Sequence, residues 1–135
     1  MLDDKERATF CAIADYLIPA YEDMPAFSQA DTQGVHTDRV LDLRPELQDS
    51  LTAALALVPP IDAISEVAEH LNREQPEIIG LIGLVASSAY YLNPDVRRRL
   101  GYPGQVQRPP GDDEAYDYED LLQPVIDRGP IFRPV

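Results

Sequence analysis

One apolar run, from Ile78 through Leu92, constrains the fold of this chain more than any other feature of its sequence. Apolar residues occur on every side of the helix that this run predicts, and Pro76 stands where the first turn of a helix tolerates proline. A helix that is apolar all round must be covered all round. It is therefore either the central core helix of a bundle or a helix whose outer surface is covered by a partner, and the sequence leaves both arrangements open.

The same run is too short and too mixed to be a membrane anchor. A bilayer span needs about 18 to 20 apolar residues. The run from Ile78 to Leu92 is shorter and contains Gly80, Gly83, Ser87 and Ser88. We therefore expect a buried helix and no membrane partner.

Prolines and capping residues divide the rest of residues 1–101 into further amphipathic helices. Asp3 and Glu6 have the spacing of a capping box, and Pro19 ends the helix that follows them. From Pro19 to Ala30 the chain has no periodicity and is expected to be a surface loop. A second helix is expected to begin at Asp31 or Thr32 and to end near Leu43. Three further helices are expected over about 45–58, 64–72 and 94–100, and Gly101 is the expected C-cap of the last one. The predicted fold is an all-α bundle of about five to six helices.

Residues 102–135 have a different character, and the sequence predicts an extended, proline-rich tail. This segment holds six of the chain's 13 prolines and shows no sustained helical or strand period. It also carries large apolar residues, which a disordered tail normally lacks. Such a segment can lie along a surface at low ordering cost, and that surface is either its own bundle or a partner. The apolar anchors are Tyr102, Val106, Tyr116, Tyr118, Leu121, Leu122, Val125, Ile126, Ile131 and Phe132.

The net charge limits the class of partner. The formal charge is -13, from 24 acidic and 11 basic residues. This charge repels phosphate backbones and anionic lipid, so a nucleic-acid or membrane-surface partner is disfavoured. Cys11 is the only cysteine, so no intramolecular disulfide forms, and we expect a small core residue there. The N-terminus shows no export signal, which predicts a cytoplasmic location, or a periplasmic one if the chain is trimmed.

The sequence contains no arrangement of residues that predicts catalysis. His36 and His70 lie on different expected helices, and neither has a second ligand at metal or haem spacing. Gly80 and Gly83 stand inside an apolar helix rather than in a strand-to-helix turn, so they do not indicate a dinucleotide. The acidic residues of 112–120 lack the glycine-centred loop of a calcium site. We therefore assign no catalytic, cofactor-binding or metal residue, and expect a chain that is not an enzyme by itself.

Three segments resemble one known family. The opening ERATFCAIADYLIPA, the run AYYLNPDVRRRLGYPGQ from Ala89 to Gln105, and the close DRGPIFRPV are similar to the gluconate 2-dehydrogenase subunit 3 family. The most distinctive part is the motif from Leu100 to Gly104. The resemblance covers nearly the whole chain, and it implies a helical small subunit of a hetero-oligomer.

The resemblance also implies what the partner is. In that family the small subunit binds a large catalytic subunit of the glucose-methanol-choline type, which holds FAD and oxidises a sugar or polyol. The flavin and the catalytic bases belong to the large chain, so no cofactor is expected here. Many relatives begin with a twin-arginine export signal that this chain lacks, which favours stabilisation of the large subunit over export. The alternative is a stand-alone helical protein-binding or self-associating module.

Candidate interface residues follow from residue type. Exposed aromatic and proline residues on an extended segment are most readily explained by contact, within the chain or with a partner. The adjacent Tyr90 and Tyr91, in the run from Ala89 to Gln105 that resembles the family, are two further candidates. The candidates are Tyr90, Tyr91, Tyr102, Pro103, Tyr116, Tyr118, Ile131 and Phe132.

Overall fold

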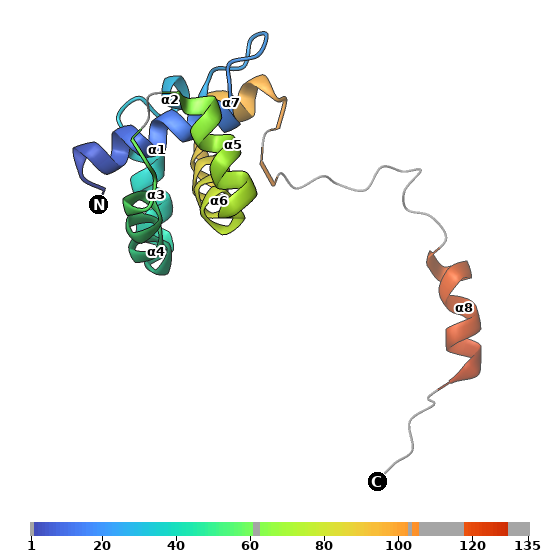
Figure 1. Ribbon diagram of the computed structural model, residues 1–135. Coiled ribbons are helices and arrows are strands. Elements are labelled where there is room, and N and C mark those ends of the chain that lie inside the picture. The colour runs from blue at the N-terminus through green and yellow to red at the C-terminus, as the bar shows by residue number, and fades with distance from the viewer. Residues whose placement is uncertain (1, 61–62, 103, 106–117, 130–135) are drawn as a thin grey trace. The chain divides into compact units, whose positions relative to one another are not determined.

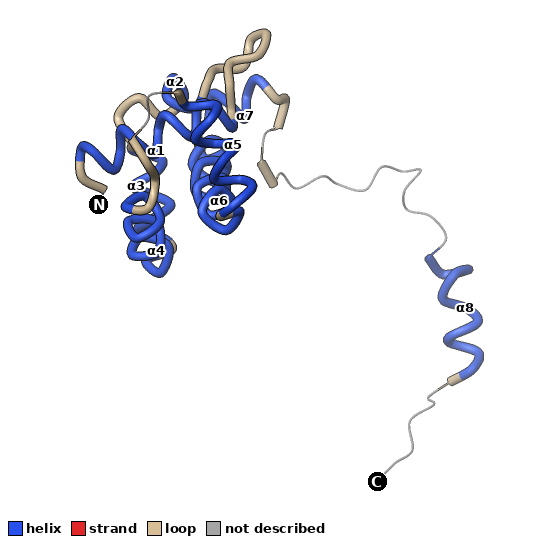
Figure 2. The backbone as a smooth tube through the Cα atoms, viewed as in Figure 1, coloured by secondary structure: helices blue, strands red, loops and turns tan. Residues whose placement is uncertain are grey.

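The structure is a computed structural model that describes residues 2–60, 63–102, 104–105 and 118–129. These residues form helices and loops with no named strand, as Figures 1 and 2 show, so the predicted all-α fold is confirmed. The chain divides into two units, residues 1–104 and residues 105–135. The helices are α1 (Asp4–Leu17), α2 (Phe27–Ala30), α3 (Val35–Leu43), α4 (Pro45–Ala56), α5 (Ile64–Glu74), α6 (Pro76–Leu92), α7 (Pro94–Arg99) and α8 (Tyr118–Arg128).

Helix α6 is the centre of the first unit. It packs against α1, α2, α3, α4, α5 and α7, and Figure 1 shows α5 lying beside it. Ile82, Val85, Ala86 and Ala89 are fully buried along its inner side. The apolar run of the sequence is thus the core helix of a bundle, which was one of the two arrangements that the sequence left open.

Helix α1 begins as the sequence predicts. The Asp3 carboxylate accepts a hydrogen bond from the Glu6 backbone N–H at 2.7 Å, and the Glu6 carboxylate accepts one from the Asp3 N–H at 2.8 Å. This capping box satisfies two backbone donors that the first turn would leave unpaired. The helix then buries Phe10, Ile13 and Ala14.

The expectation of a surface loop from Pro19 to Ala30 is corrected in its second half. Phe27 begins the one-turn helix α2 and is fully buried. Its ring meets the Phe10 ring edge to face, with centroids 5.4 Å apart and planes at 89°. Two aromatic residues 17 positions apart in sequence carry no periodic signal, so only the folded chain shows that this segment enters the core.

The start of α3 is also corrected, because it lies at Val35 rather than at Asp31 or Thr32. Asp31 still acts as its cap from a position before the helix. Its carboxylate accepts hydrogen bonds from the backbone N–H groups of His36 and Thr37, both at 2.9 Å, and from the Thr37 hydroxyl at 2.6 Å. Gly34 provides the left-handed turn between cap and helix, with φ of 69°.

Helix α7 ends in a Schellman motif that uses the predicted Gly101. Gly101 has φ of 67°, and its N–H donates to the Arg98 carbonyl at 3.0 Å. The Tyr102 N–H donates to the Arg97 carbonyl at 2.9 Å. This hydrogen-bond pair closes the helix and directs the chain away from it. The motif from Leu100 to Gly104, which resembles the family, therefore begins with the residues that end α7, and Tyr102 is exposed directly after them.

Helix α8 is a correction to the expectation of a tail without helical period. The spacing of Leu121, Leu122, Val125 and Ile126 is compatible with one apolar stripe on a helix. The prolines of the segment hid this pattern, because Pro124 stands inside the helix and removes one backbone donor. The side chains of Leu122, Val125 and Ile126 are all at least half exposed.

No helix among the described residues combines the length and the apolarity that crossing a membrane requires.

Candidate interaction surface

The outer side of α6 is left uncovered by the other helices. Gly80, Leu84 and Tyr91 are exposed, and their spacing of four and seven residues places them on one stripe of the helix. A side chain added at Gly80 would meet no atom within 4 Å, so nothing in the domain packs there. The outward stripe of the core helix thus carries two large apolar residues, Leu84 and Tyr91, together with Gly80 and the partly exposed Ser87.

The two adjacent tyrosines at the end of α6 have opposite surroundings. Tyr90 is only 4% exposed, and its hydroxyl donates a hydrogen bond to the Pro25 carbonyl at 2.7 Å. Burial is the main cause that raises the pKa of this hydroxyl, and the neighbouring Tyr91 adds to it. Tyr91 is 55% exposed and meets the Tyr90 ring edge to face at 5.6 Å. Tyr90 belongs to the core, so Tyr91 is the member of the pair that a partner can reach.

Large exposed apolar residues continue from α6 to the end of α7. We call residues 84–102 the α6–α7 segment. A single exposed leucine on a surface is ordinary, whereas several large ones on one rigid stretch indicate an interaction site. Its exposed apolar residues are Leu84 at 48%, Tyr91 at 55%, Leu92 at 36%, Leu100 at 52% and Tyr102 at 54%.

Buried and polar contacts hold α7 in place on the domain. Val96, a residue of α7, is fully buried. Asn93 caps α7 by accepting from the Asp95 N–H at 2.7 Å, and its side-chain amide donates to the Ala30 carbonyl at 2.7 Å. The Arg99 guanidinium donates to the Asp23 carbonyl in the turn between Tyr21 and Met24. The exposed residues of α7 therefore stand on a fixed support.

A notch of about 430 Å³ opens on α7. The residues that line it are Pro94, Arg97, Arg98, Gly101 and Tyr102. Its described lining thus brings together two arginines, one tyrosine and the glycine of the Schellman motif. This combination is suited to binding an anionic group attached to an apolar one.

The remaining interface candidates lie mostly outside the part of the chain that the structure describes. Pro103, Tyr116, Ile131 and Phe132 fall outside it. Tyr118 is the first residue of α8, and its side chain is not described. Of the eight candidates, Tyr91 and Tyr102 are the two that the structure shows exposed on the domain, and both lie in the α6–α7 segment.

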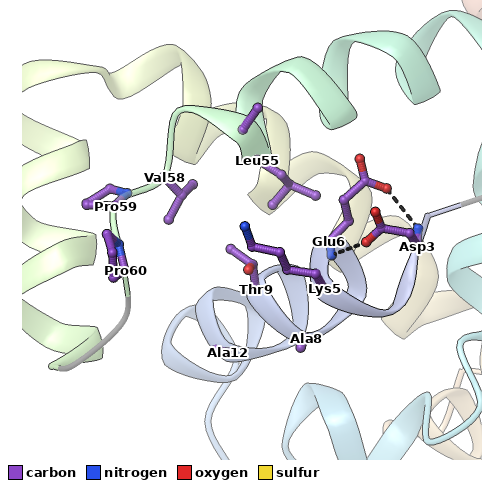
Figure 3. Close-up of a pocket in the computed structure, with 11 residues that line it drawn as sticks. Asp3, Lys5, Glu6, Ala8, Thr9, Ala12, Leu55, Val58, Pro59 and Pro60 are labelled. Carbon is purple, nitrogen blue, oxygen red and sulfur yellow. Dashed lines mark hydrogen bonds between the residues drawn. The ribbon is translucent and has the colours of Figure 1, made fainter.

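A larger groove of about 650 Å³ lies between the start of α1 and the end of α4. Figure 3 shows Lys5 and Thr9 on one wall and Val58, Pro59 and Pro60 on the other. The carboxylates of Asp3 and Glu6 at its edge are both engaged in the capping box. Its described lining thus offers one cation and one hydroxyl among apolar groups, without a paired nucleophile and base.

The histidines and the cysteine do not combine into a reactive site among the described residues. No group of three or more histidine, cysteine or acidic residues within that part of the chain has the geometry of a metal site. Cys11 is half buried in α1, and burial, followed by the Asp15 charge, raises the pKa of its thiol. A thiol with a raised pKa is a poor nucleophile, which fits the structural role predicted for it.

No protein-family model, curated protein or solved structure matches this chain. The similarity of its motifs to the gluconate 2-dehydrogenase subunit 3 family therefore stays a prediction.

Proposed function

We propose that this chain is a non-catalytic small subunit that binds and stabilises a larger catalytic subunit. The observation that carries this proposal is the set of large exposed apolar residues that runs from Leu84 on α6 through α7 to Tyr102. The same stretch holds most of the family-like run from Ala89 to Gln105, so the motif that suggests the partner and the exposed apolar residues overlap. We infer that the partner is an FAD-containing dehydrogenase of the glucose-methanol-choline type, which would supply the flavin and the catalytic bases.

The proposal places the contact with the large subunit on the helical domain. The helical domain of residues 1–104 brings a rigid surface, and covering its apolar residues would contribute about 25 cal/mol per Å² of buried apolar area. The chain contains a single cysteine, so its fold depends on no internal disulfide and this subunit needs no oxidising compartment in order to fold. Substrate, which we expect to be a sugar or polyol, is handled by the large subunit.

Co-expression tests the proposal. The large subunit would be a flavoprotein dehydrogenase of the glucose-methanol-choline type from the same organism, produced with and without this chain. We expect the soluble yield and the flavin content of the large subunit to fall when the small chain is missing. Equal yield, flavin content and turnover in both preparations would remove the proposal.

A matched pair of variants locates the contact. Leu84→Asp places a charge on the exposed stripe of α6, whereas Leu43→Asp places one at the end of α3, where Leu43 is 56% exposed. We expect loss of co-purification with the first variant and retention with the second. Equal retention would show that the outer side of α6 is not the interface.

The alternative function is a stand-alone helical binding or self-associating module. The domain has a continuous core built from six of its own helices around α6, which favours a chain that folds without help. Self-association depends on protein concentration, so sedimentation of the purified chain over a wide concentration range separates the two functions. A chain that stays monomeric over this range supports the first proposal, whereas a chain that associates with itself supports the alternative.

A further inference from the structure

The cations of this chain are concentrated where the apolar surface ends. Arg97, Arg98 and Arg99 are consecutive, in a chain that has only 11 basic residues and a formal charge of -13. They occupy the last turn of α7, where the helix dipole favours positive charge. A cation at this position is thus explained by the helix alone, and a binding role requires a further observation.

Two observations meet this requirement: the notch on α7, and the difference between the contacts that the three arginine side chains make. Arg98 pairs with Asp95 at 2.6 Å, and Arg99 donates to the Asp23 carbonyl. Arg97 lines the notch, and its side chain makes no ion pair or hydrogen bond with another described residue. Its backbone is fixed on both sides, since its N–H donates to the Asn93 carbonyl and its carbonyl accepts from Tyr102. Arg97 therefore lines an open notch, and within the described part of the chain its side chain has no counter-ion.

We propose that this notch binds a carboxylate side chain, from aspartate or glutamate, on an acidic segment of a partner protein. A guanidinium receives a carboxylate through two parallel hydrogen bonds, which is a strong and directional contact. Arg97 supplies this contact, Arg98 adds positive charge, and the Tyr102 ring packs on the methylene group that carries the carboxylate. The neighbouring apolar residues Tyr91 and Leu100 extend the interface beyond the ion pair.

A second copy of this chain is a poor occupant, although it is rich in carboxylates. The commonest dimer has two-fold symmetry and brings the same patch of both subunits together. A two-fold dimer centred on α7 would place the three arginines of one copy against the three of the other, and like charges facing each other weaken association. The charge pattern therefore favours a different protein with an acidic segment.

The first test uses the isolated full chain labelled with ¹⁵N. The probes are a peptide of alternating glutamate and leucine and a matched peptide in which glutamine replaces glutamate. We expect the acidic peptide alone to shift the amide signals of residues 94–102. Equal shifts with both peptides, or shifts spread over all basic residues, would overturn the proposal, as would concentration-dependent dimerisation of the chain through α7.

Arginine variants supply the control. Arg73 is also an arginine in the last turn of a helix, α5, and its side chain is 68% exposed. Arg97→Glu and Arg98→Glu should each weaken peptide binding about tenfold or more, whereas Arg73→Glu should leave it unchanged. Arg97→Lys keeps the charge but loses the paired geometry, so we expect an intermediate affinity. Because Arg98 is largely exposed, its variant tests the notch even if Arg97→Glu does not fold. An equal loss of peptide affinity in Arg73→Glu would show that the effect comes from the overall charge of the chain, and it would refute binding at the notch.

The second test uses the large subunit, whose identity rests on the proposed function. Raised salt and Arg97→Glu should both weaken its binding, mainly by slowing association. If the wild-type chain binds the large subunit and Arg97→Glu binds equally well, the notch is wrong and the function stands. If the acidic peptide binds at α7 and the large subunit does not bind at all, the function is wrong and the notch stands.

Discussion

At the scale of single residues, Gly34 shows how one backbone conformation decides a local fold. Its left-handed φ of 69° joins α2 to α3. A Cβ built at this position would lie 1.7 Å from Arg7 Nη1 and 2.7 Å from Arg7 Cζ. The Arg7 guanidinium is held there by its ion pair with Asp38 at 2.8 Å. Glycine is thus required twice, by the turn and by the side chain that lies against it.

We predict that Gly34→Ala destabilises the protein by about 1 to 3 kcal/mol. Left-handed backbone costs an alanine about 1 to 2 kcal/mol, and displacing Arg7 weakens the pair with Asp38. Gly80→Ala is the matched control, because Gly80 lies in α6 with open space around it and alanine favours a helix by up to about 1 kcal/mol. Chemical denaturation measures both, and a stability loss in Gly80→Ala equal to that in Gly34→Ala would contradict this explanation.

We predict that the Cys11 thiol makes the stability of the folded chain depend on pH. Burial, the Asp15 charge and the Asp31 charge raise its pKa above 9.0, and Arg7 opposes them. The folded state therefore holds the proton more tightly than the unfolded state. Its contribution to stability is complete below the unfolded pKa and is lost as pH rises through the folded pKa.

The expected result is a loss of stability above about pH 9 that is smaller in Cys11→Ala. Tyr90, whose pKa is also raised, adds a loss at higher pH in both proteins, so the difference between them isolates the thiol. Thiol-reactive reagents should also label Cys11 several-fold more slowly in the folded chain than in urea. Equal labelling rates would show that the thiol is not protected.

At the scale of elements, α6 combines a core side and an outer side in one helix. Ile82 is fully buried, whereas Leu84, two residues later, is 48% exposed. The sequence could not separate these sides, since an all-apolar run has no polar stripe to mark the surface. Only the positions of the surrounding helices decide which residues remain outside.

We predict opposite outcomes for two truncations in α6. Ile82→Ala should lower the free energy of unfolding by about 2 to 5 kcal/mol, because it leaves a cavity. Leu84→Ala should change it by less than about 0.5 kcal/mol while weakening partner binding. Thermal and chemical denaturation measure the first effect, and co-purification with the large subunit measures the second. A large stability loss in Leu84→Ala would place that residue in the core and argue against the interface.

The elements also show which helices the sequence could predict. Helices α1, α4, α5, α6 and α7 have clear caps, prolines or apolar stripes, and their observed bounds lie close to the expected ones. Helix α2 was missed because a single turn has no period to detect. Helix α8 was missed because Pro124 is read as a break, although its four apolar neighbours are spaced for a helix.

At the scale of the whole molecule, the charge of -13 acts on stability as well as on partner choice. An excess of one sign destabilises a compact state through self-repulsion. We predict that the melting temperature rises when salt increases from about 0.01 to about 0.1 M, because the screening length falls from about 30 to about 10 Å. Sodium and potassium chloride should act alike, and a rise with only one of them would indicate specific ion binding instead.

Local chemistry in the sequence determined the all-α class, the main helix boundaries and the turn at Gly101, because caps, prolines and left-handed glycines act over a few residues. Tertiary structure alone decided that Phe27 enters the core, that Tyr90 is buried while Tyr91 is exposed, and that Arg97 lines a notch without an ion pair to any other described residue. These outcomes depend on which distant segments pack together, and nothing in a residue's own neighbours along the chain specifies that. For the same reason, the surface left open on α6 emerged only once the other helices were in place.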